Sequence, residues 1–343
     1  MRSTLMLIPP LLHRFGAASI EEDATGCTLG VREIDPHIEV FQAFGAEVDR
    51  KPDILNISTP KGFSASDHWL DYASVTTTEN FVLCAATARG RSQLTNAACE
   101  PHVQEFCSFL TAVGARIGGC GSSSLQIDGI ESSTLGGAEF TFTDDFHEVA
   151  TFLALSAITG GDVTVRNGAA AQFPLLDRTF AKFGVEVEHR DGFSRARAGH
   201  PLKVRQPFTP NILQKVEAAP WPYVPADLLP IFVALGVRAE GSVMFWNKVY
   251  EGALGWSSEL GKFGAHAVLC DPHRLIIYGG KPLNPSTVES PYIIRVAIAL
   301  FMLAASIPGR STILNALPIK RAHPRFVENL NALGASVEWL EGD

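Results

Sequence analysis

Apolar and polar positions alternate in a pattern that recurs along the chain. Four short phrases begin with Gly, continue with alternating apolar residues and end in Asn six positions later: GRSQLTN from Gly90, GDVTVRN from Gly161, GSVMFWN from Gly241 and GRSTILN from Gly309. Alternation with a period of two is typical of a half-buried β-strand. Each phrase therefore predicts a Gly turn followed by a strand.

A second recurring signature reads FGAEV, VGARI, FGVEV, FGAHA and LGASV. The segments PHVQEFCSFLTAVGA and PRFVENLNALGA, which contain two of these signatures, carry apolar residues at the i, i+3, i+4 and i+7 spacing of a helix. Because glycine tolerates the left-handed cap conformation, we expect each helix to end at the glycine. The glycines are Gly45, Gly114, Gly184, Gly264 and Gly334, at intervals of 69, 70, 80 and 70 residues.

The two signatures combine into a larger unit. After each glycine cap comes a second strand pattern, such as SLQIDGIE or RLIIYGG, and another apolar helix, such as VATFLALSAITG, leads into the next Gly turn. An α/β solenoid would be one interpretation of such a period. The small number of copies and the longer interval before Gly264 instead favour α/β globular domains of a few units each.

Composition and charge narrow the function. The 343 residues are 46% hydrophobic and 19% charged, which indicates a compact globular protein and excludes disorder, collagen and coiled coil. The formal net charge of -8, without a prominent run of Lys or Arg, argues against a sequence-independent grip on nucleic acid. We therefore expect a small-molecule ligand.

Cysteine usage and hydropathy suggest a cytoplasmic location. The six cysteines lack CxxC spacing, which fits a reducing compartment. The most apolar stretch, Val296 to Ile307, has 12 residues, short of the roughly 20 that a spanning helix requires. No membrane span is predicted.

The segment GCTLGVREIDPH, from Gly26 to His37, places reactive side chains close together. Cys27 follows a glycine, and Arg32, Asp35 and His37 lie within ten positions of it. A nearby cation such as Arg32 can lower the pKa of a thiol, which then serves as a nucleophile or an acid. The alternative is a buried structural cysteine in a turn.

Several arginines lie in apolar surroundings, which is unusual for a solvated charge. Arg295 interrupts the apolar segment YIIRVAIALFMLAA, and Arg2, Arg32 and Arg321 have similar neighbours. A buried guanidinium must be paired, and its planar donors suit phosphate and carboxylate ligands. An internal salt bridge is the alternative for each of them.

Two further positions lie at expected helix starts. Asp227, after the Pro-rich loop in APWPYVPADLLPIF, is either an N-cap or a general base held at the start of a helix. Ser74 and the three threonines that follow Val75 begin a helix, where hydroxyls and free N–H groups either cap the helix or hold a phosphate. No GxGxxG, P-loop, HExxH or zinc spacing is present.

These motifs, in this order and on this repeat, resemble the enolpyruvyl transferase family over the whole chain. GCTLGVREIDPH is similar to the family's GGCxIGxRPVDxH loop, YASVTTTEN to KxSVGATEN, NAACEPHV to NAAxEPEI and PYVPADLLPIF to PGFPTDxQAxF. The start, MRSTLMLIPPLLHRFG, resembles the family's MRAS stretch. Arg295 matches the arginine of the DLR motif, and Arg321 matches that of DRGY.

The resemblance implies a fold and two domains. It implies two inside-out α/β barrels built from βαβαββ repeats, with the active site between the domains. We expect an incomplete first domain, residues 1–142, that lacks one repeat and carries the catalytic loop, and a second domain over residues 143–343.

The resemblance also implies an activity. It is transfer of the enolpyruvyl group of phosphoenolpyruvate to the 3-hydroxyl of UDP-N-acetylglucosamine, with release of phosphate, in peptidoglycan precursor synthesis. Cys27 would be the loop acid and Asp227 the base. No metal or organic cofactor is implied. The implied substrate-binding residues are Arg2, Arg32, Asp35, His37, Ser74, Val75, Glu100, Arg295 and Arg321.

Departures from the family's motifs leave two alternatives open. Ala253 stands in place of the arginine of FExRF, and the lysine-bearing SGAKN motif has no counterpart, which suits a non-catalytic paralog or fragment that binds a nucleotide sugar. Tyr72 and Phe146 replace a lysine and an arginine, which suits an enolpyruvyl transferase with another acceptor.

Overall fold

The computed structural model describes residues 2–21, 33–52, 54–131 and 134–340, and these form two units. The first contains the described residues up to Phe142 together with Pro220–Pro222. The second contains Thr143–Ala219 and the described residues from Tyr223 onward. Two expected site residues, Cys27 and Arg32, lie outside the described residues, and for Arg2 only the backbone is described.

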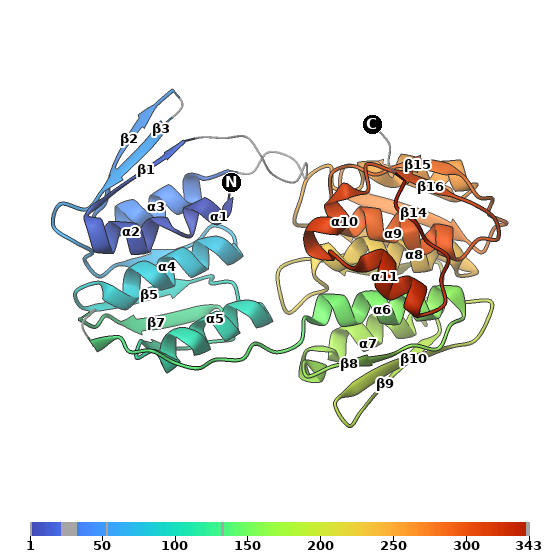
Figure 1. Ribbon diagram of the computed structural model, residues 1–343, viewed down its shortest axis with the longest axis horizontal. Coiled ribbons are helices and arrows are strands. Elements are labelled where there is room, and N and C mark those ends of the chain that lie inside the picture. The colour runs from blue at the N-terminus through green and yellow to red at the C-terminus, as the bar shows by residue number, and fades with distance from the viewer. Residues whose placement is uncertain (1, 22–32, 53, 132–133, 341–343) are drawn as a thin grey trace. The chain divides into compact units, whose positions relative to one another are not determined.

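The first unit combines two sheets with helices (Figure 1). One sheet is antiparallel, in the order β1-β3-β2, and the other has the order β4-β5-β7-β6 with β4 and β5 parallel. The helices are α1 (Arg2–Leu5), α2 (Ile8–Phe15), α3 (Asp35–Ala43), α4 (Val75–Thr87) and α5 (Pro101–Ala112). The strands are β1 (Ala17–Glu21), β2 (Glu47–Lys51), β3 (Ile54–Ser58), β4 (Asp67–Trp69), β5 (Arg91–Thr95), β6 (Arg116–Gly118) and β7 (Ser124–Asp128).

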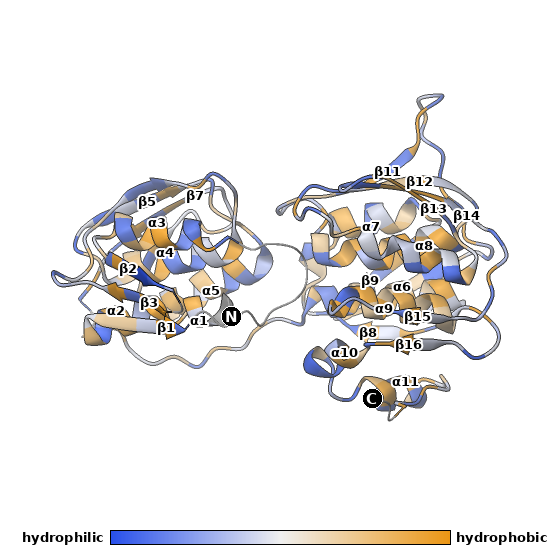
Figure 2. Ribbon diagram, turned by 90° about the horizontal axis from the view of Figure 1, so that it is seen from above, coloured by the Kyte–Doolittle hydropathy of each residue, from blue (hydrophilic) through white to orange (hydrophobic). Residues whose placement is uncertain are grey.

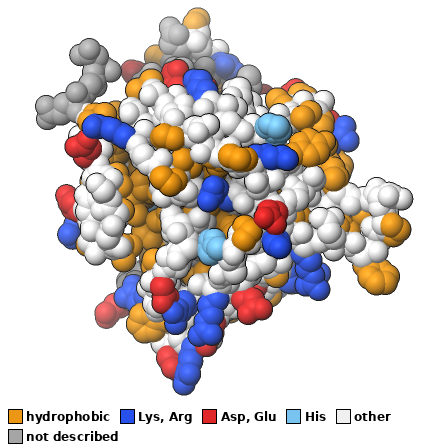
Figure 3. All heavy atoms as spheres, turned by 90° about the vertical axis from the view of Figure 1, so that its right-hand side faces the viewer, with side chains coloured by type: hydrophobic (Ala, Val, Ile, Leu, Met, Phe, Trp, Pro, Cys, Tyr) orange, Lys and Arg blue, Asp and Glu red, His pale blue; other side chains and the backbone are white. Residues whose placement is uncertain are grey.

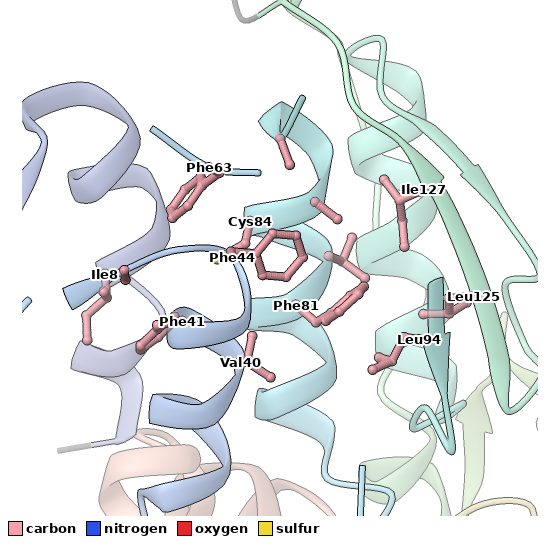
Figure 4. Close-up of a cluster of buried hydrophobic side chains, with 14 of the residues drawn as sticks. Ile8, Val40, Phe41, Phe44, Phe63, Phe81, Cys84, Leu94, Leu125 and Ile127 are labelled. Carbon is pink, nitrogen blue, oxygen red and sulfur yellow. The ribbon is translucent and has the colours of Figure 1, made fainter. Parts of the chain in front are cut away.

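Helix α4 lies in the core of the first unit (Figure 4). Its Phe81 is fully buried, and the Phe81 ring centroid lies 4.8 Å from that of Phe44 in an edge-to-face contact. At the other end of the core, a Cβ on Gly129 would lie 1.7 Å from the carbonyl oxygen of Ala88. Only glycine therefore lets the chain after β7 approach the end of α4 so closely.

The second unit has the same kinds of layers. Its sheets have the orders β8-β10-β9, β11-β12-β14-β13 and β15-β16. The α-helices are α6 (Phe146–Thr159), α7 (Pro174–Ala181), α8 (Leu229–Arg238), α9 (Ile294–Ala305), α10 (Leu317–Ala322) and α11 (Phe326–Ala332), and the 3₁₀ helices are η2 (Ala170–Gln172), η3 (Ala226–Leu228) and η4 (Gly255–Phe263). The strands are β8 (Thr164–Arg166), β9 (Val185–Arg190), β10 (Phe193–Ala198), β11 (Gln214–Ala218), β12 (Gly241–Asn247), β13 (His266–Asp271), β14 (Arg274–Gly279), β15 (Thr287–Glu289) and β16 (Thr312–Leu314).

Three apolar helices form the interior of the second unit. Figure 2 shows α6, α8 and α9 lying between the sheets, with mostly apolar residues. Helix α8 is buried on all sides, from Leu229 to Val237. An all-round apolar helix is stable in water only when it is enclosed, so the sheets must cover it on more than one face.

Most of the local predictions are confirmed; among the described residues up to 340, however, the strand expected after Gly334 does not form, and one helix differs in type. The four Gly-to-Asn phrases contain β5, β8, β12 and β16, and all five expected cap glycines have positive φ, from 75° at Gly184 to 115° at Gly114. The helix that differs in type lies before Gly264, where the chain forms the 3₁₀ helix η4 instead of an α-helix. Apolar spacing alone does not separate these two helix types over nine residues.

The surface of the molecule carries charges of both signs. On the face that Figure 3 shows, acidic and basic side chains are interspersed among apolar and polar ones. Some of the opposite charges on the surface form exposed ion pairs, such as Arg310 with Glu338 at 2.7 Å. Within the described part of the chain, no helix has both the length and the apolar character needed to cross a membrane.

Candidate active site

The second unit contains a hollow that brings together residues far apart in the sequence. The space inside it is about 20 Å³, room for a water molecule, and Asp227, Asn247 and Arg295 line it. The remaining lining residues are Ala226, Leu229, Pro230, Tyr250, Ala253, Leu254, Ile293 and Val296. Residues that carry a carboxylate, an amide, a phenol and a guanidinium thus line one largely apolar hollow.

Asp227 reaches the hollow from the 3₁₀ helix η3, which leads directly into α8. The N-cap of η3 is Pro225 and that of α8 is Leu228, so the interpretation of Asp227 as an N-cap is wrong. Its side chain is exposed. An exposed carboxylate at the edge of a hollow is suited to accept a proton from a bound hydroxyl.

Arg295 reaches the same hollow from the first turn of α9. Its Nη1 donates to Oε1 of Glu148 at 2.8 Å and to Oγ1 of Thr151 at 3.2 Å, and its side chain is 15% exposed. The internal salt bridge that the sequence left open is therefore present. It does not exclude a ligand, because a guanidinium has five N–H donors and both contacts use Nη1.

Two departures from the family's motifs also lie at the hollow. Ala253 and Ile293 line it; by the resemblance to the family's motifs, they stand at the arginine of FExRF and at the aspartate of DLR. Both replacements remove a charge from the lining. The charges contributed by the lining residues are consequently those of Asp227 and Arg295.

Arg321 lies in α10 of the same unit, outside the lining of the hollow. It is exposed, and its guanidinium carbon lies 5.6 Å from the centroid of the Tyr292 ring. This cation–π contact orients the guanidinium without burying it.

In the first unit, Ser74 and Val75 mark the start of α4 as expected. Ser74 is the N-cap, and its Oγ accepts a hydrogen bond from Oγ1 of Thr77 at 2.9 Å. Thr78 is fully buried, and its Oγ1 accepts from the backbone N–H of Ala98. Of the hydroxyls considered for phosphate binding, those of Thr77 and Thr78 are therefore used inside the protein.

Asp35 and His37 lie in the first turn of α3 but differ in exposure. Asp35 is exposed, whereas His37 is 1% exposed. Nδ2 of Asn80 donates to Nδ1 of His37 at 2.8 Å, and Nε2 of His37 faces the hydroxyls of Thr76 and Thr77 at 3.4 and 3.5 Å. His37 therefore joins α3 to α4.

Glu100, the N-cap residue of α5, is part of a buried acidic pair. Its Oε1 accepts from the backbone N–H of Trp221 at 3.3 Å, and its Oε2 is buried without a hydrogen-bond partner. Burial raises the pKa of Glu100, although backbone hydrogen bonds oppose the increase. Burial, with the negative charge of Glu100, raises the pKa of Glu79 to about 7.

Sequence reasoning missed several residues around these sites. Asn247 is the last residue of the phrase GSVMFWN, but the sequence did not indicate that it lines the hollow. Its Oδ1 accepts hydrogen bonds from the backbone N–H groups of Val249 and Tyr250. No sequence signal distinguished Glu79 or Glu148. Among the described residues, no group of three or more His, Cys, Asp or Glu side chains could hold a metal ion.

Comparison with known proteins identifies the family. Residues 1–330 match the model of the EPSP synthase (3-phosphoshikimate 1-carboxyvinyltransferase) family. The UDP-N-acetylglucosamine 1-carboxyvinyltransferase of Borrelia garinii is 33% identical over 99% of this chain and 78% of its own length, and that of Treponema pallidum is 34% identical over 100% and 79%.

Solved structures agree on the fold. The enolpyruvyl transferase NikO from Streptomyces tendae aligns with a TM-score of 0.84 at 22% identity, over 98% of this chain and 77% of that one. EPSP synthase from Acinetobacter baumannii aligns with a TM-score of 0.73 at 19% identity, over 98% and 78%. By sequence and by fold, the chain belongs to the EPSP synthase family of enolpyruvyl transferases.

Proposed function

We propose that the protein transfers the enolpyruvyl group of phosphoenolpyruvate to the 3-hydroxyl of UDP-N-acetylglucosamine and releases phosphate, a step in peptidoglycan precursor synthesis. Membership of the family and the names of its curated relatives support this reaction. The observation that carries it is the presence of Asp227 and Arg295 in one hollow. The proposed base and the proposed anion-binding cation thereby line the same hollow.

The chemistry requires three functions at the site. A base accepts the proton of the attacking hydroxyl, an acid protonates the methylene carbon, and cations stabilise the phosphate and carboxylate of the tetrahedral ketal. Asp227 is the proposed base and Cys27 the proposed acid. Arg32, Arg295 and Arg321 are the proposed ligands of the phosphoenolpyruvate anion.

The nucleotide sugar would be held by residues of the first unit. Asp35 offers a carboxylate in the first turn of α3 that can accept a hydrogen bond from a substrate donor, and Ser74 offers a hydroxyl at the start of α4, where a helix N-terminus favours anions. Because His37 is buried, it would act on the substrate only indirectly, by fixing the position of α4 through its contact with Asn80. The remaining proposed substrate-binding residues are Arg2, Val75 and Glu100.

The proposed architecture is that of two inside-out α/β barrels with βαβαββ repeats, over residues 1–142 and 143–343. The shared order of the four-stranded sheets, β4-β5-β7-β6 and β11-β12-β14-β13, supports the repeat. The proposed location is the cytoplasm. A reducing compartment suits the described cysteines, Cys84, Cys99, Cys107, Cys120 and Cys270, which are free thiols.

Phosphate release from phosphoenolpyruvate by the purified chain tests the function. We expect release that requires UDP-N-acetylglucosamine and equals the amount of enolpyruvyl product. No release from a folded protein that still binds the nucleotide sugar would indicate a non-catalytic paralog. Release with another nucleotide, but not with this one, would indicate a different acceptor.

A further inference from the structure

One carboxylate oxygen in the second unit has two nitrogen neighbours. Oε1 of Glu148, on α6, accepts from Nη1 of Arg295 at 2.8 Å, and Nε2 of His323 lies 3.1 Å from the same oxygen without hydrogen-bond geometry. The side chains of Arg295 and His323 are each 15% exposed and that of Glu148 is 27% exposed. The three residues come from α6, α9 and the end of α10, so tertiary packing fixes the cluster.

Glu148 and Thr151 together determine how Arg295 is presented to the hollow. They lie three positions apart on α6 and therefore on one face of that helix. Both accept from Nη1, at 2.8 and 3.2 Å. The orientation of the guanidinium is thereby fixed on one side, while Arg295 lines the hollow with Asp227.

The cluster combines two carboxylates with one guanidinium and two imidazoles. Burial alone would raise the pKa of Glu148, but His323 and Arg295 outweigh it and hold the pKa below its usual value. Asp145, the N-cap of α6, also interacts with Arg295; despite burial, its contacts with His147 and Arg295 lower its pKa to about 2. One guanidinium thus faces two carboxylates at neutral pH.

A bound anion would add to this negative charge in a partly dry site. Uncompensated charge away from water is costly, and a neighbouring group that gains a proton reduces the cost. Histidine is the side chain suited to such an exchange near neutral pH. His323 contacts Glu148 directly, whereas Nδ1 of His147 lies 3.5 Å from Asp145.

We propose that Glu148 is the positioning residue for Arg295, and that His323 takes up a proton from solvent when phosphoenolpyruvate binds beside that guanidinium. The inference rests on the proposed function. The proton returns to solvent when the anion leaves.

The groups facing His323 explain why the cation is favoured in the bound state. Glu148 on α6 and Arg295 on α9 carry the nearest charges, and the ring of Phe326 on α11 lies 5.9 Å away. Asp145 and His147 lie at the start of α6, and Lys320 and Arg321 belong to α10 itself. An anion beside Arg295 offsets its positive charge, which leaves Glu148 to stabilise the imidazolium.

Calorimetric titration with phosphoenolpyruvate tests proton uptake without turnover. The whole chain is titrated without an acceptor at pH 7, in buffers of different ionisation enthalpy, so that the slope gives the number of protons taken up. We expect the wild type to take up more protons than His323→Gln, by up to about one per anion. Subtracting the proton uptake of His323→Gln from that of the wild type cancels any protons that phosphoenolpyruvate itself gains or loses on binding.

Two substitutions of Glu148 separate its two roles. Glu148→Gln keeps an oxygen for Nη1 but removes the charge; we expect the KM for phosphoenolpyruvate to stay within about threefold and the additional proton uptake to be lost. Glu148→Ala removes the acceptor; we expect this KM to rise at least about tenfold, with the KM for UDP-N-acetylglucosamine unchanged. Glu338→Gln, which breaks the exposed pair with Arg310, is the matched control.

Three results would overturn the inference while leaving the proposed function intact. They are binding with the same proton uptake in the wild type and His323→Gln, loss of uptake in His147→Gln only, and an unchanged KM for phosphoenolpyruvate in Glu148→Ala. Failure of the wild type to bind phosphoenolpyruvate would overturn the proposed function and this inference together.

Discussion

Asn80 donates a hydrogen bond of 2.8 Å from its Nδ2 to Nδ1 of His37, across 43 positions of the chain. Both side chains are buried, His37 at 1% and Asn80 at 0% exposure. The contact assigns the ring proton of His37 to Nε2, which faces threonine hydroxyls at the start of α4. It therefore fixes α3, with Asp35 in its first turn, against the start of α4.

Removing this contact should destabilise the first unit. Asn80→Ala leaves Nδ1 of His37 buried without its donor, which costs about 1–3 kcal/mol of unfolding free energy. Urea denaturation measures the loss. The control is Asn56→Ala, which breaks a solvent-exposed hydrogen bond with Ser19 and should cost about 0.5 kcal/mol or less. Equal losses in the two variants would contradict the importance of the buried pair.

Glu79 should make the protein less stable as pH rises toward neutrality. Burial, with the charge of Glu100, raises its pKa from 4.5 to about 7, so between these values the folded state holds a proton that the unfolded state has lost. Unfolding free energy therefore falls through this window, by roughly 3 kcal/mol in total. Denaturation at pH 5 and pH 8 measures the fall.

Glu79→Gln is the variant that tests this assignment. It should remove most of the fall and raise the stability at pH 8, because the amide needs no proton to remain neutral. Glu39→Gln, at an exposed position on α3, should leave the pH dependence as it is in the wild type. A steep fall that persists in Glu79→Gln would assign the titration to another group.

Cys120 should be the reactive member of a pair of thiols. A hydrogen bond with Cys107 lowers the pKa of Cys120 to about 7, and the same hydrogen bond, with burial, raises the pKa of Cys107 far above its usual range. Cys120 is exposed and Cys107 is buried. Alkylation of Cys120 by iodoacetamide should therefore increase with pH around a midpoint near 7, whereas Cys107 stays unmodified in the folded chain.

Mass spectrometry of peptides from the alkylated protein measures both cysteines. In Cys107→Ala, the midpoint for Cys120 should move up toward 9.0, the ordinary value for a thiol. A midpoint that stays near 7 in this variant would show that the hydrogen bond is not the cause.

Asp227→Asn should stop catalysis without unfolding the protein. The amide keeps the shape of the side chain but cannot accept the hydroxyl proton, so kcat should fall by roughly 10² to 10⁴. Because Asp227 is exposed, unfolding free energy should change by about 0.5 kcal/mol or less. The phosphate-release assay and thermal denaturation measure the two effects. Asp191→Asn, on an exposed turn, should retain activity, and full activity in Asp227→Asn would exclude this residue as the base.

The sequence by itself determined the local elements. The segment PHVQEFCSFLTAVGA contains α5, Pro101–Ala112, and Gly114 follows it with a φ of 115°. Helix periodicity and the need for glycine at positive φ are properties of neighbouring residues, so they are visible in a single sequence. The family's motifs likewise lie within short segments, which is why the resemblance could be stated before the fold was known.

Only the tertiary structure decided which side chains meet. Arg295 and Glu148 are 147 positions apart, and no periodicity or motif in the sequence pairs them. The buried pair of His37 and Asn80 also arises from tertiary packing. Asp227 lies within η3 and is not an N-cap residue, and this position depends on how the loop before α8 folds. Contacts between distant segments arise from the packing of whole helices and sheets, and the local sequence does not encode their geometry.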